Sequence, residues 1–288
     1  MKVLITGSNG QLGYELTRTA PEGVELTCVD VEQLDITSEA AVTNFFAEHT
    51  PDVVINAAAY TAVDKAESDS ELAYAVNAVG PELLAKACVD AGSFMVHVST
   101  DFVFDGNQST PYKPEDHPKP VSVYGNSKLK GEEQVTSILG NHAVIIRTAW
   151  VYSTHGNNFV KTMLRLMKEK DQLGIVADQI GTPTWAKTLA ECCWNVVGQK
   201  LEAIYHWTDA GAASWYDFAV AIQEEALELG LLKKAIPIKP IAATTYPTPA
   251  KRPAFSVLDK QSAYDQLPMP IKHWRNCLKA MLNELQEQ

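Results

Sequence analysis

Gly7-Ser8-Asn9-Gly10-Gln11-Leu12-Gly13 is the stretch of this chain that predicts most about its fold. Glycines at this spacing permit a tight turn, let the backbone approach a pyrophosphate and let a helix pack closely on a strand. The stretch follows a strand-like run, Lys2–Thr6, and precedes a segment of helical periodicity whose first N–H groups would face the anion. We therefore predict a strand, a phosphate-binding turn and a helix in this order. A plain glycine-rich turn is the alternative.

Short β-rich runs alternate with longer segments of helical periodicity through the first half of the chain. This order is typical of a parallel sheet covered by helices on both faces. We predict an α/β fold with a doubly wound, Rossmann-type parallel sheet and a smaller α+β substrate lobe. The predicted strands are Lys2–Thr6, Val24–Asp30, Val53–Ala57, Phe94–Ser99 and Ala143–Thr148, and Ser70–Ala91 is a predicted helix.

The pattern becomes less regular after Val151. We predict that residues 1–150 form a dinucleotide-binding domain, that parts of 172–207 return to it, and that 151–171 and 208–288 form the substrate-binding lobe. Further helices are predicted at Asn158–Lys170, Lys187–Gly198, Ser214–Gly230 and Ile271–Leu285, and strands at Leu173–Ala177 and Ala203–Trp207. Ser214 and Asp217 fit a capping box, so we expect them to cap a helix rather than to be catalytic.

The composition is that of a soluble globular protein, with 46% hydrophobic and 20% charged residues among 288. A net charge of −11 gives nucleic acid or an anionic membrane no general attraction, so neither is an expected partner. No apolar run approaches the ~20 residues that cross a bilayer, and no signal-like segment begins the chain, which favours the cytoplasm. The five cysteines show no CxxC motif or Cys/His cluster, so we expect reduced thiols and no metal site.

A second motif, Tyr124-Gly125-Asn126-Ser127-Lys128, carries the candidate chemistry. Residues four apart lie on one face of a helix, so the Lys128 ammonium is expected near the Tyr124 hydroxyl, where it would lower the pKa of Tyr124 from ~10. Such a tyrosine is a usable proton donor. The predicted strand ahead of it runs into Ser99 and Thr100, at the edge where ligands of such sheets bind. Either hydroxyl can hydrogen-bond a reacting oxygen.

The order of these motifs resembles the extended short-chain dehydrogenase/reductase family. The resemblance rests on the glycine turn, Asn56-Ala57-Ala58-Ala59, Ser99-Thr100-Asp101 and the YxxxK pair, and it covers nearly the whole chain. Longer stretches narrow it toward members that reduce nucleotide sugars: Ala59–Glu67, Ser99–Phe104, Arg147–Tyr152, Asp178–Thr184 and Tyr246–Pro253. The last three are far more specific than the cofactor motif.

The resemblance implies hydride transfer from NADH or NADPH to the C4 ketone of a nucleotide sugar, a small-molecule substrate. It implies that Tyr124 protonates the nascent oxyanion, that Thr100 holds this oxygen, and that Lys128 contacts the nicotinamide ribose. Asn77 matches an asparagine of the family's proton relay, with a helix-surface amide as the alternative. Trp150 matches a tryptophan at the sugar site, and Arg252 suits the substrate diphosphate. A core tryptophan and a surface arginine are the alternatives.

The candidate site residues form three groups, each with its own role. The catalytic candidates are Thr100, Tyr124 and Lys128. The cofactor candidates are Gly7, Asn9, Gly10, Gln11, Leu12, Gly13, Asp30, Asp35, Ala57, Ala58 and Ala59, together with Tyr124 and Lys128. The substrate candidates are Thr100, Asp101, Trp150, Asn158 and Arg252.

Asp30 bears on the choice between the two dinucleotides. It ends the second predicted strand, and neither the five residues after it nor the glycine turn contains a base. An acid there suits a ribose diol and repels a 2′-phosphate. We therefore expect a modest preference for NADH, about 10-fold in kcat/KM.

Two other functions remain open at this point. A regulatory subunit similar to the β subunit of methionine adenosyltransferase would share the fold without catalysis, although Arg147–Tyr152 and Asp178–Thr184 favour an enzyme. The second alternative function is that of an epimerase or dehydratase on the same scaffold. Phe102 stands where a dehydratase needs a glutamate. Phe255 stands where the family usually has asparagine, which bears on substrate contacts and not on the reaction. The sequence leaves open the oligomeric state, a homodimer included, the exact deoxysugar and any role of a divalent ion.

Overall fold

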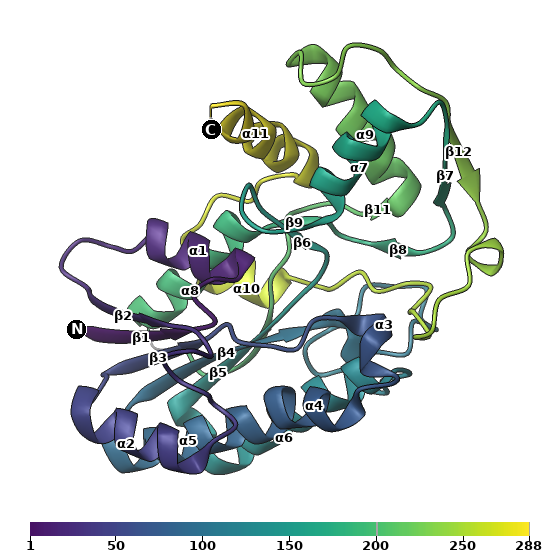
Figure 1. The fold of residues 1–288 in the computed structure, drawn as a ribbon. Coiled ribbons are helices and arrows are strands. Elements are labelled where there is room, and N and C mark those ends of the chain that lie inside the picture. The colour runs from purple at the N-terminus through teal and green to yellow at the C-terminus, as the bar shows by residue number, and fades with distance from the viewer. Residues whose placement is uncertain (200, 288) are drawn as a thin grey trace.

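The computed structural model describes residues 1–199 and 201–287. Its main sheet has six parallel strands in the order β2-β1-β3-β4-β5-β10 (Figure 1). These are β1 (Lys2–Thr6), β2 (Glu25–Val29), β3 (Val53–Asn56), β4 (Phe94–Thr100), β5 (Ala143–Thr148) and β10 (Ala203–His206). The predicted doubly wound parallel sheet is confirmed, and the first five strands agree with the predicted ones to within one residue at each end.

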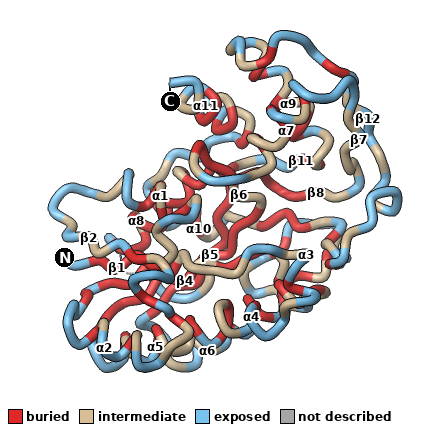
Figure 2. Tube along the Cα trace, viewed as in Figure 1, coloured by how far each residue is buried: buried red, intermediate tan, exposed pale blue. Residues whose placement is uncertain are grey.

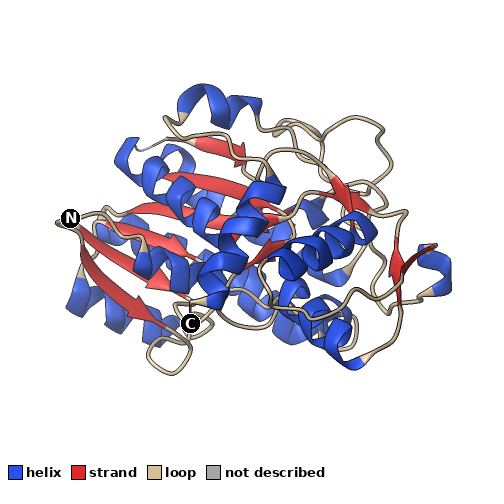
Figure 3. Cartoon of the chain, turned by 90° about the horizontal axis from the view of Figure 1, so that it is seen from above, coloured by secondary structure: helices blue, strands red, loops and turns tan. Residues whose placement is uncertain are grey.

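Helices cover both faces of this sheet, as Figure 3 shows from above. One face carries α1 (Gln11–Arg18), α8 (Ala186–Gln199) and α10 (Gln261–Gln266), and the other carries α2 (Glu39–His49), α5 (Gly80–Ala91) and α6 (Val123–Leu139). Successive side chains of a strand point to opposite faces, so Val3 and Ile5 belong to one core while Leu4 belongs to the other. The inner strands β1, β3, β4 and β5 are therefore largely buried, whereas the edge strand β2 is mostly not (Figure 2).

The predicted helix Ser70–Ala91 is interrupted by a π-helical turn. It consists of α4 (Ser70–Tyr74), the π-helical segment η1 (Ala75–Val79) and α5. π-turns inside α-helices are frequent at functional sites. Short helical turns that the sequence did not predict are α3 (Val63–Ala66), η2 (Asp101–Val103), η3 (Gly140–His142) and η4 (Ala243–Thr245).

A second core lies beyond the sheet, built mainly by α7 (Phe159–Glu169), α9 (Trp215–Glu228) and α11 (Trp274–Gln286). Short strand pairs border it: β6 (Val151–Tyr152) with β9 (Thr184–Trp185), β8 (Ile180–Gly181) with β11 (Ala213–Ser214), and β7 (Leu173–Val176) with β12 (Ile238–Ile241). Within 172–207, α8 and β10 belong to the main sheet and its covering layer, whereas β7 pairs with β12. Ser214 and Asp217 form the predicted capping box. None of the helices described is long and apolar enough to span a membrane.

Candidate active site

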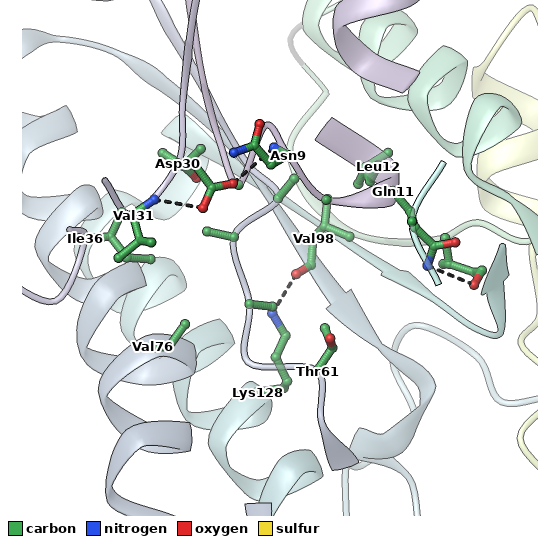
Figure 4. Close-up of a pocket in the computed structure, with 18 of the residues that line it drawn as sticks. Asn9, Gln11, Leu12, Asp30, Val31, Ile36, Thr61, Val76, Val98 and Lys128 are labelled. Carbon is green, nitrogen blue, oxygen red and sulfur yellow. Dashed lines mark hydrogen bonds between the residues drawn. The ribbon is translucent and has the colours of Figure 1, made fainter. Parts of the chain in front are cut away.

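The strand order reverses at β1, because the chain runs outward to β2 and then crosses to β3 on the other side of β1. Ligands of open α/β sheets bind at such a point, outside the carboxyl ends of the strands. A cavity of about 510 Å³ lies there, between the glycine turn, the loop after β3 and the start of α6 (Figure 4). Every predicted cofactor residue except Gly13 lines it: Gly7, Asn9, Gly10, Gln11, Leu12, Asp30, Asp35, Ala57, Ala58, Ala59, Tyr124 and Lys128.

The glycine turn can approach the rest of the fold only because its glycines lack Cβ atoms. Gly7 has a φ of +69°, and a Cβ atom on it would lie 2.7 Å from the Cα and N atoms of Ala58. A Cβ atom on Gly13 would lie 2.3 Å from the carbonyl oxygen of Gly7. Gly13 therefore holds α1 against the turn rather than lining the cavity.

Asp30 lies at the end of β2 beside the glycine turn (Figure 4). Its carboxylate accepts hydrogen bonds from the N–H of Asn9 at 3.1 Å and the N–H of Val31 at 2.8 Å. The carboxylate of Asp35 is held locally, because it accepts from the N–H and the hydroxyl of Thr37 at 2.9 and 2.7 Å. Asp30 therefore fixes the turn as well as lining the cavity.

Thr100, Asp101 and Tyr124 form one buried group where β4 meets α6. The Thr100 hydroxyl donates to the Asp101 carboxylate at 3.1 Å. Burial raises the pKa of Tyr124 to about 12, and a hydrogen bond with Thr100 opposes part of this rise. Burial also raises the pKa of Asp101 to about 6, against hydrogen bonds with Ser256 and Thr100. The tyrosine therefore keeps its proton through the neutral range.

Lys128 lies one helical turn beyond Tyr124 and is also buried. Its ammonium donates to the carbonyl oxygen of Val98 in β4 at 2.8 Å (Figure 4). Burial lowers the pKa of Lys128 to about 8, with Glu132 acting in the opposite direction. The expectation that Lys128 lowers the pKa of Tyr124 is wrong for this arrangement, because desolvation is the main cause of the shift of the phenol and the Lys128 ammonium is held by the carbonyl oxygen of Val98 in β4.

Asn77 is fully buried in η1, so the alternative of a helix-surface amide is wrong. Its Oδ1 accepts from the N–H of Tyr60 at 2.8 Å, and its Nδ2 donates to the carbonyl of Tyr60 at 3.1 Å and to the Ser127 hydroxyl at 3.0 Å. The Ser127 hydroxyl donates in turn to the carbonyl oxygen of Tyr124 at 2.8 Å. Asn77 thus ties the loop after β3 to the helix that carries Tyr124 and Lys128.

Two substrate candidates, which do not line the cavity, have partners of their own within the chain. Arg252 donates to the Asp64 carboxylate at 2.7 Å, and Asp64 belongs to α3, which packs on α6. Trp150 follows the cavity-lining Thr148 and stacks on Trp215, with ring centroids 3.5 Å apart and an interplanar angle of 8°. Its φ of +48° is unusual for a bulky residue, and such strain clusters at functional sites.

Asn158, the remaining substrate candidate, is occupied by contacts within the chain. Its Oδ1 accepts from the N–H of Lys161 and so caps α7. Its Nδ2 donates to the side chain of Gln11 at 2.9 Å and to the carbonyl of Ser153 at 2.7 Å. None of the substrate candidates lines the cavity.

Sequence reasoning missed several residues of the cavity wall. Gly156 and Asn157 line it from the segment that follows β6, next to the Asn158 that the sequence favoured. The only sequence signal for these two residues was a glycine followed by two asparagines ahead of a predicted helix. The apolar residues Leu34, Ile36 and Val76 also line it, and they gave no signal distinct from that of core residues.

The five cysteines carry no disulfide, and Cys28 alone among them is exposed. Burial raises the pKa of the Cys88 and Cys193 thiols to about 12, which keeps them protonated. Across residues 1–199 and 201–287, no group of three or more His, Cys, Asp and Glu side chains is arranged to hold a metal ion.

Comparison with known proteins identifies the family. A family model described as the RmlD substrate binding domain matches residues 1–287. The dTDP-4-dehydrorhamnose reductase of Escherichia coli K12 is 40% identical over 295 aligned positions, covering 99% of this chain and 98% of that protein. A solved dTDP-4-dehydrorhamnose reductase from Clostridium acetobutylicum is 43% identical, with a TM-score of 0.94 and coverage of 99% and 100%.

A second solved structure adds a ligand. The dTDP-4-dehydrorhamnose reductase of Bacillus anthracis, solved in complex with NADP, is 35% identical, with a TM-score of 0.93 and coverage of 98% of this chain and 99% of that one. A UDP-glucose 4-epimerase from Thermus thermophilus, at 20% identity and a TM-score of 0.83, shares the fold alone. The chain belongs to the RmlD substrate binding domain family, the family of these dTDP-4-dehydrorhamnose reductases.

Proposed function

We propose that this protein reduces the C4 ketone of dTDP-4-dehydro-L-rhamnose to give dTDP-L-rhamnose, with NADPH or NADH as the reductant. The observation that carries the proposal is that Tyr124 and Lys128 line the same cavity as the glycine turn. Full-length similarity to reductases of this activity supports it.

The lining of the cavity suits a dinucleotide. The first N–H groups of α1 have no acceptor within the helix, and Gly10 at its N-cap has no side chain to cap them. Such groups suit a diphosphate. They provide a local attraction for an anion on a chain whose net charge is −11. The bound reduced nicotinamide supplies the hydride.

Tyr124 is the proton donor in this proposal. A pKa raised by burial to about 12 keeps the phenol protonated at neutral pH, as reduction of a ketone requires. Thr100 adjoins this phenol and orients the ketone oxygen, and Lys128 anchors the nicotinamide ribose. Asn77 positions the helix that carries Tyr124 and Lys128 by its hydrogen bond to Ser127.

Residues 1–150, with α8 and β10, bind the dinucleotide in this proposal, and the remaining lobe takes the nucleotide sugar. Trp150 contacts the sugar beside Asp101. Arg252 binds the diphosphate with the N–H donors that Asp64 leaves, since a guanidinium carries five. Asn158 contributes by fixing Gln11 at the start of α1.

We propose further that NADH is used about 10-fold better than NADPH in kcat/KM, because the Asp30 carboxylate lies in the cavity wall at the end of β2. The Bacillus anthracis relative carries NADP in its crystal structure. Both reductants must therefore be compared directly.

Product analysis tests the proposed function. The purified protein is incubated with dTDP-4-dehydro-L-rhamnose and either NADH or NADPH, and both dinucleotide oxidation and the sugar product are measured. We expect one equivalent of dinucleotide oxidised per dTDP-L-rhamnose formed. An epimerised sugar without dinucleotide consumption would identify an epimerase. Dinucleotide binding without turnover would favour a regulatory subunit.

A further inference from the structure

The segment 153–158, which follows β6, lies against the glycine turn and the start of α1. The Ser153 hydroxyl donates to the fully buried carboxylate of Glu15 at 2.9 Å. Asn158 donates to Gln11 at 2.9 Å, and Gln11 lies within 3.5 Å of the carbonyl oxygen of Val151. The side of this segment that faces the cavity is formed by Gly156 and Asn157.

His155 contacts the glycine turn directly. Its Nε2 lies 2.9 Å from the carbonyl oxygen of Asn9, and its ring stacks on Tyr14 with centroids 4.5 Å apart and planes 10° apart. A carbonyl oxygen only accepts, so Nε2 carries the proton and donates. The stack holds the ring in the orientation that this hydrogen bond needs.

Asn9 links this contact to the end of β2. Its carbonyl accepts from His155, while its N–H donates to the Asp30 carboxylate at 3.1 Å. Both polar groups of one peptide residue are therefore fixed, one by the segment after β6 and the other by the end of β2. Asn9 and Asp30 both line the cavity.

We propose that His155 is a positioning residue for dinucleotide binding: its hydrogen bond to Asn9 holds the glycine turn, and through it Asp30, in the geometry that accepts the cofactor. This rests on the proposed function, in which the cavity binds a dinucleotide. A turn already held in place loses less conformational freedom when the ligand binds. The effect acts on affinity for the dinucleotide rather than on the chemistry at Tyr124.

Three variants separate the hydrogen bond from the stack. His155→Phe keeps a flat ring on Tyr14 but removes the donor, whereas His155→Gln keeps an N–H donor and loses the aromatic stack. His142→Phe is the matched control, because His142 is exposed at the amino end of β5, the opposite edge of the sheet. Dissociation constants for NADH and NADPH are measured by fluorescence titration without nucleotide sugar. Amide hydrogen exchange over residues 7–14 is followed in the same variants without dinucleotide.

We expect His155→Phe to weaken dinucleotide binding about 5- to 10-fold and to speed exchange at the glycine turn, since one neutral hydrogen bond is worth about 1 kcal/mol. His155→Gln should recover most of both. Wild-type affinity in His155→Phe, or a Gln variant as weak as the Phe variant, would overturn the inference while leaving the proposed function intact. Failure of the wild-type protein to bind either dinucleotide would instead overturn the proposed function.

Discussion

The cavity and the candidate substrate residues are held in place differently. On the side of β1 and β3 the cavity is bounded by main chain, which we call the main-chain side: the glycine turn and the loop Ala57–Ala59, in contact so close that Gly7 has no room for a Cβ atom. The substrate candidates Arg252 and Trp150 lie outside the cavity lining, on what we call the side-chain side, and each is held by a paired side chain, Arg252 by Asp64 and Trp150 by Trp215.

This difference predicts how each side responds to substitution. A main-chain surface is indifferent to most side-chain changes but does not accept an added Cβ atom, because backbone cannot move aside cheaply. A surface of paired side chains depends on both partners, and it can exchange one partner for a ligand. We expect the first side to select a dinucleotide and the second to adjust to the nucleotide sugar.

The largest effect is expected where the two sides meet, at Tyr124. Tyr124→Phe removes the proton donor and keeps the packing of the ring against Phe102, so kcat should fall about 10²- to 10⁴-fold while dinucleotide affinity stays close to normal. Single-turnover kinetics and fluorescence titration measure the two quantities. Retention of more than about a third of kcat, under conditions where chemistry limits the rate, would rule out general acid catalysis by Tyr124.

The main-chain side is tested by two alanine substitutions in one turn. Gly13→Ala places a Cβ atom 2.3 Å from the carbonyl oxygen of Gly7, whereas Gly10→Ala places one at 3.2 Å from the same oxygen, where a small shift accommodates it. Overpacking against backbone costs about 1–3 kcal/mol, so we expect Gly13→Ala to weaken dinucleotide binding about 10- to 100-fold and to lower Tm. Equal affinities in the two variants would show that the close packing is dispensable.

The side-chain side is tested at Arg252. Arg252→Gln should raise KM for the nucleotide sugar about 10-fold or more, because a charge-assisted hydrogen bond is worth about 1.5–3 kcal/mol. Asp64→Asn is the matched variant. It keeps the Arg252 guanidinium but weakens the hydrogen bond that holds the guanidinium in place, so we expect a smaller rise in KM. Affinity for the dinucleotide should change in neither. If KM for the nucleotide sugar is unaffected in Arg252→Gln, Arg252 does not bind the substrate and only joins its own loop to α3 through Asp64.

The fold and the main-chain side could be read from the sequence because both depend on local patterns. Short runs of β-branched apolar residues mark strands such as Ala143–Thr148, and three glycines within seven residues mark a turn that has no room for Cβ atoms. The π-turn around Asn77 was not predicted, since one extra residue per turn barely disturbs the apolar periodicity of Ser70–Ala91.

The partners of the substrate candidates could not be predicted from one sequence. Arg252 and Asp64 are 188 positions apart, and Asn158 and Gln11 are 147 apart, so no local spacing links them. The effect of Lys128 on Tyr124 was misjudged for a related reason. Helical spacing places Tyr124 and Lys128 on one face. The carbonyl of Val98, however, determines where the Lys128 ammonium lies, and burial determines the direction in which the pKa of Tyr124 shifts.

Lys128 supplies a pH test of the region between the two sides. Burial lowers its pKa to about 8, so the charged form prevails below pH 8 and is lost as the pH rises above it. If the ammonium holds the ribose, the dissociation constant of the dinucleotide should rise about 10-fold between pH 7 and pH 9. Lys128→Met should bind weakly at both values, without this dependence. A wild-type affinity that is constant across the range would remove the ammonium from cofactor binding.

The smallest effect is expected at Asp30, where the main-chain side carries its one cofactor-selecting charge in this proposal. Asp30→Ala removes the charge and also frees the N–H groups of Asn9 and Val31, whereas Asp30→Asn removes the charge but keeps an acceptor for one of them. Loss of repulsion toward a 2′-phosphate should shift the NADH-to-NADPH ratio of kcat/KM about 10-fold toward NADPH in both variants, equivalent to about 1.4 kcal/mol.

The two variants also separate charge from loop geometry, because only Asp30→Ala should weaken both dinucleotides together. The measurement is kcat/KM for each reductant at fixed, saturating nucleotide sugar. A wild-type protein that prefers NADPH tenfold, with a ratio that neither substitution alters, would show that the end of β2 does not select the cofactor. The choice would then lie elsewhere in the cavity wall, where the Thr37 hydroxyl is held by the carboxylate of Asp35.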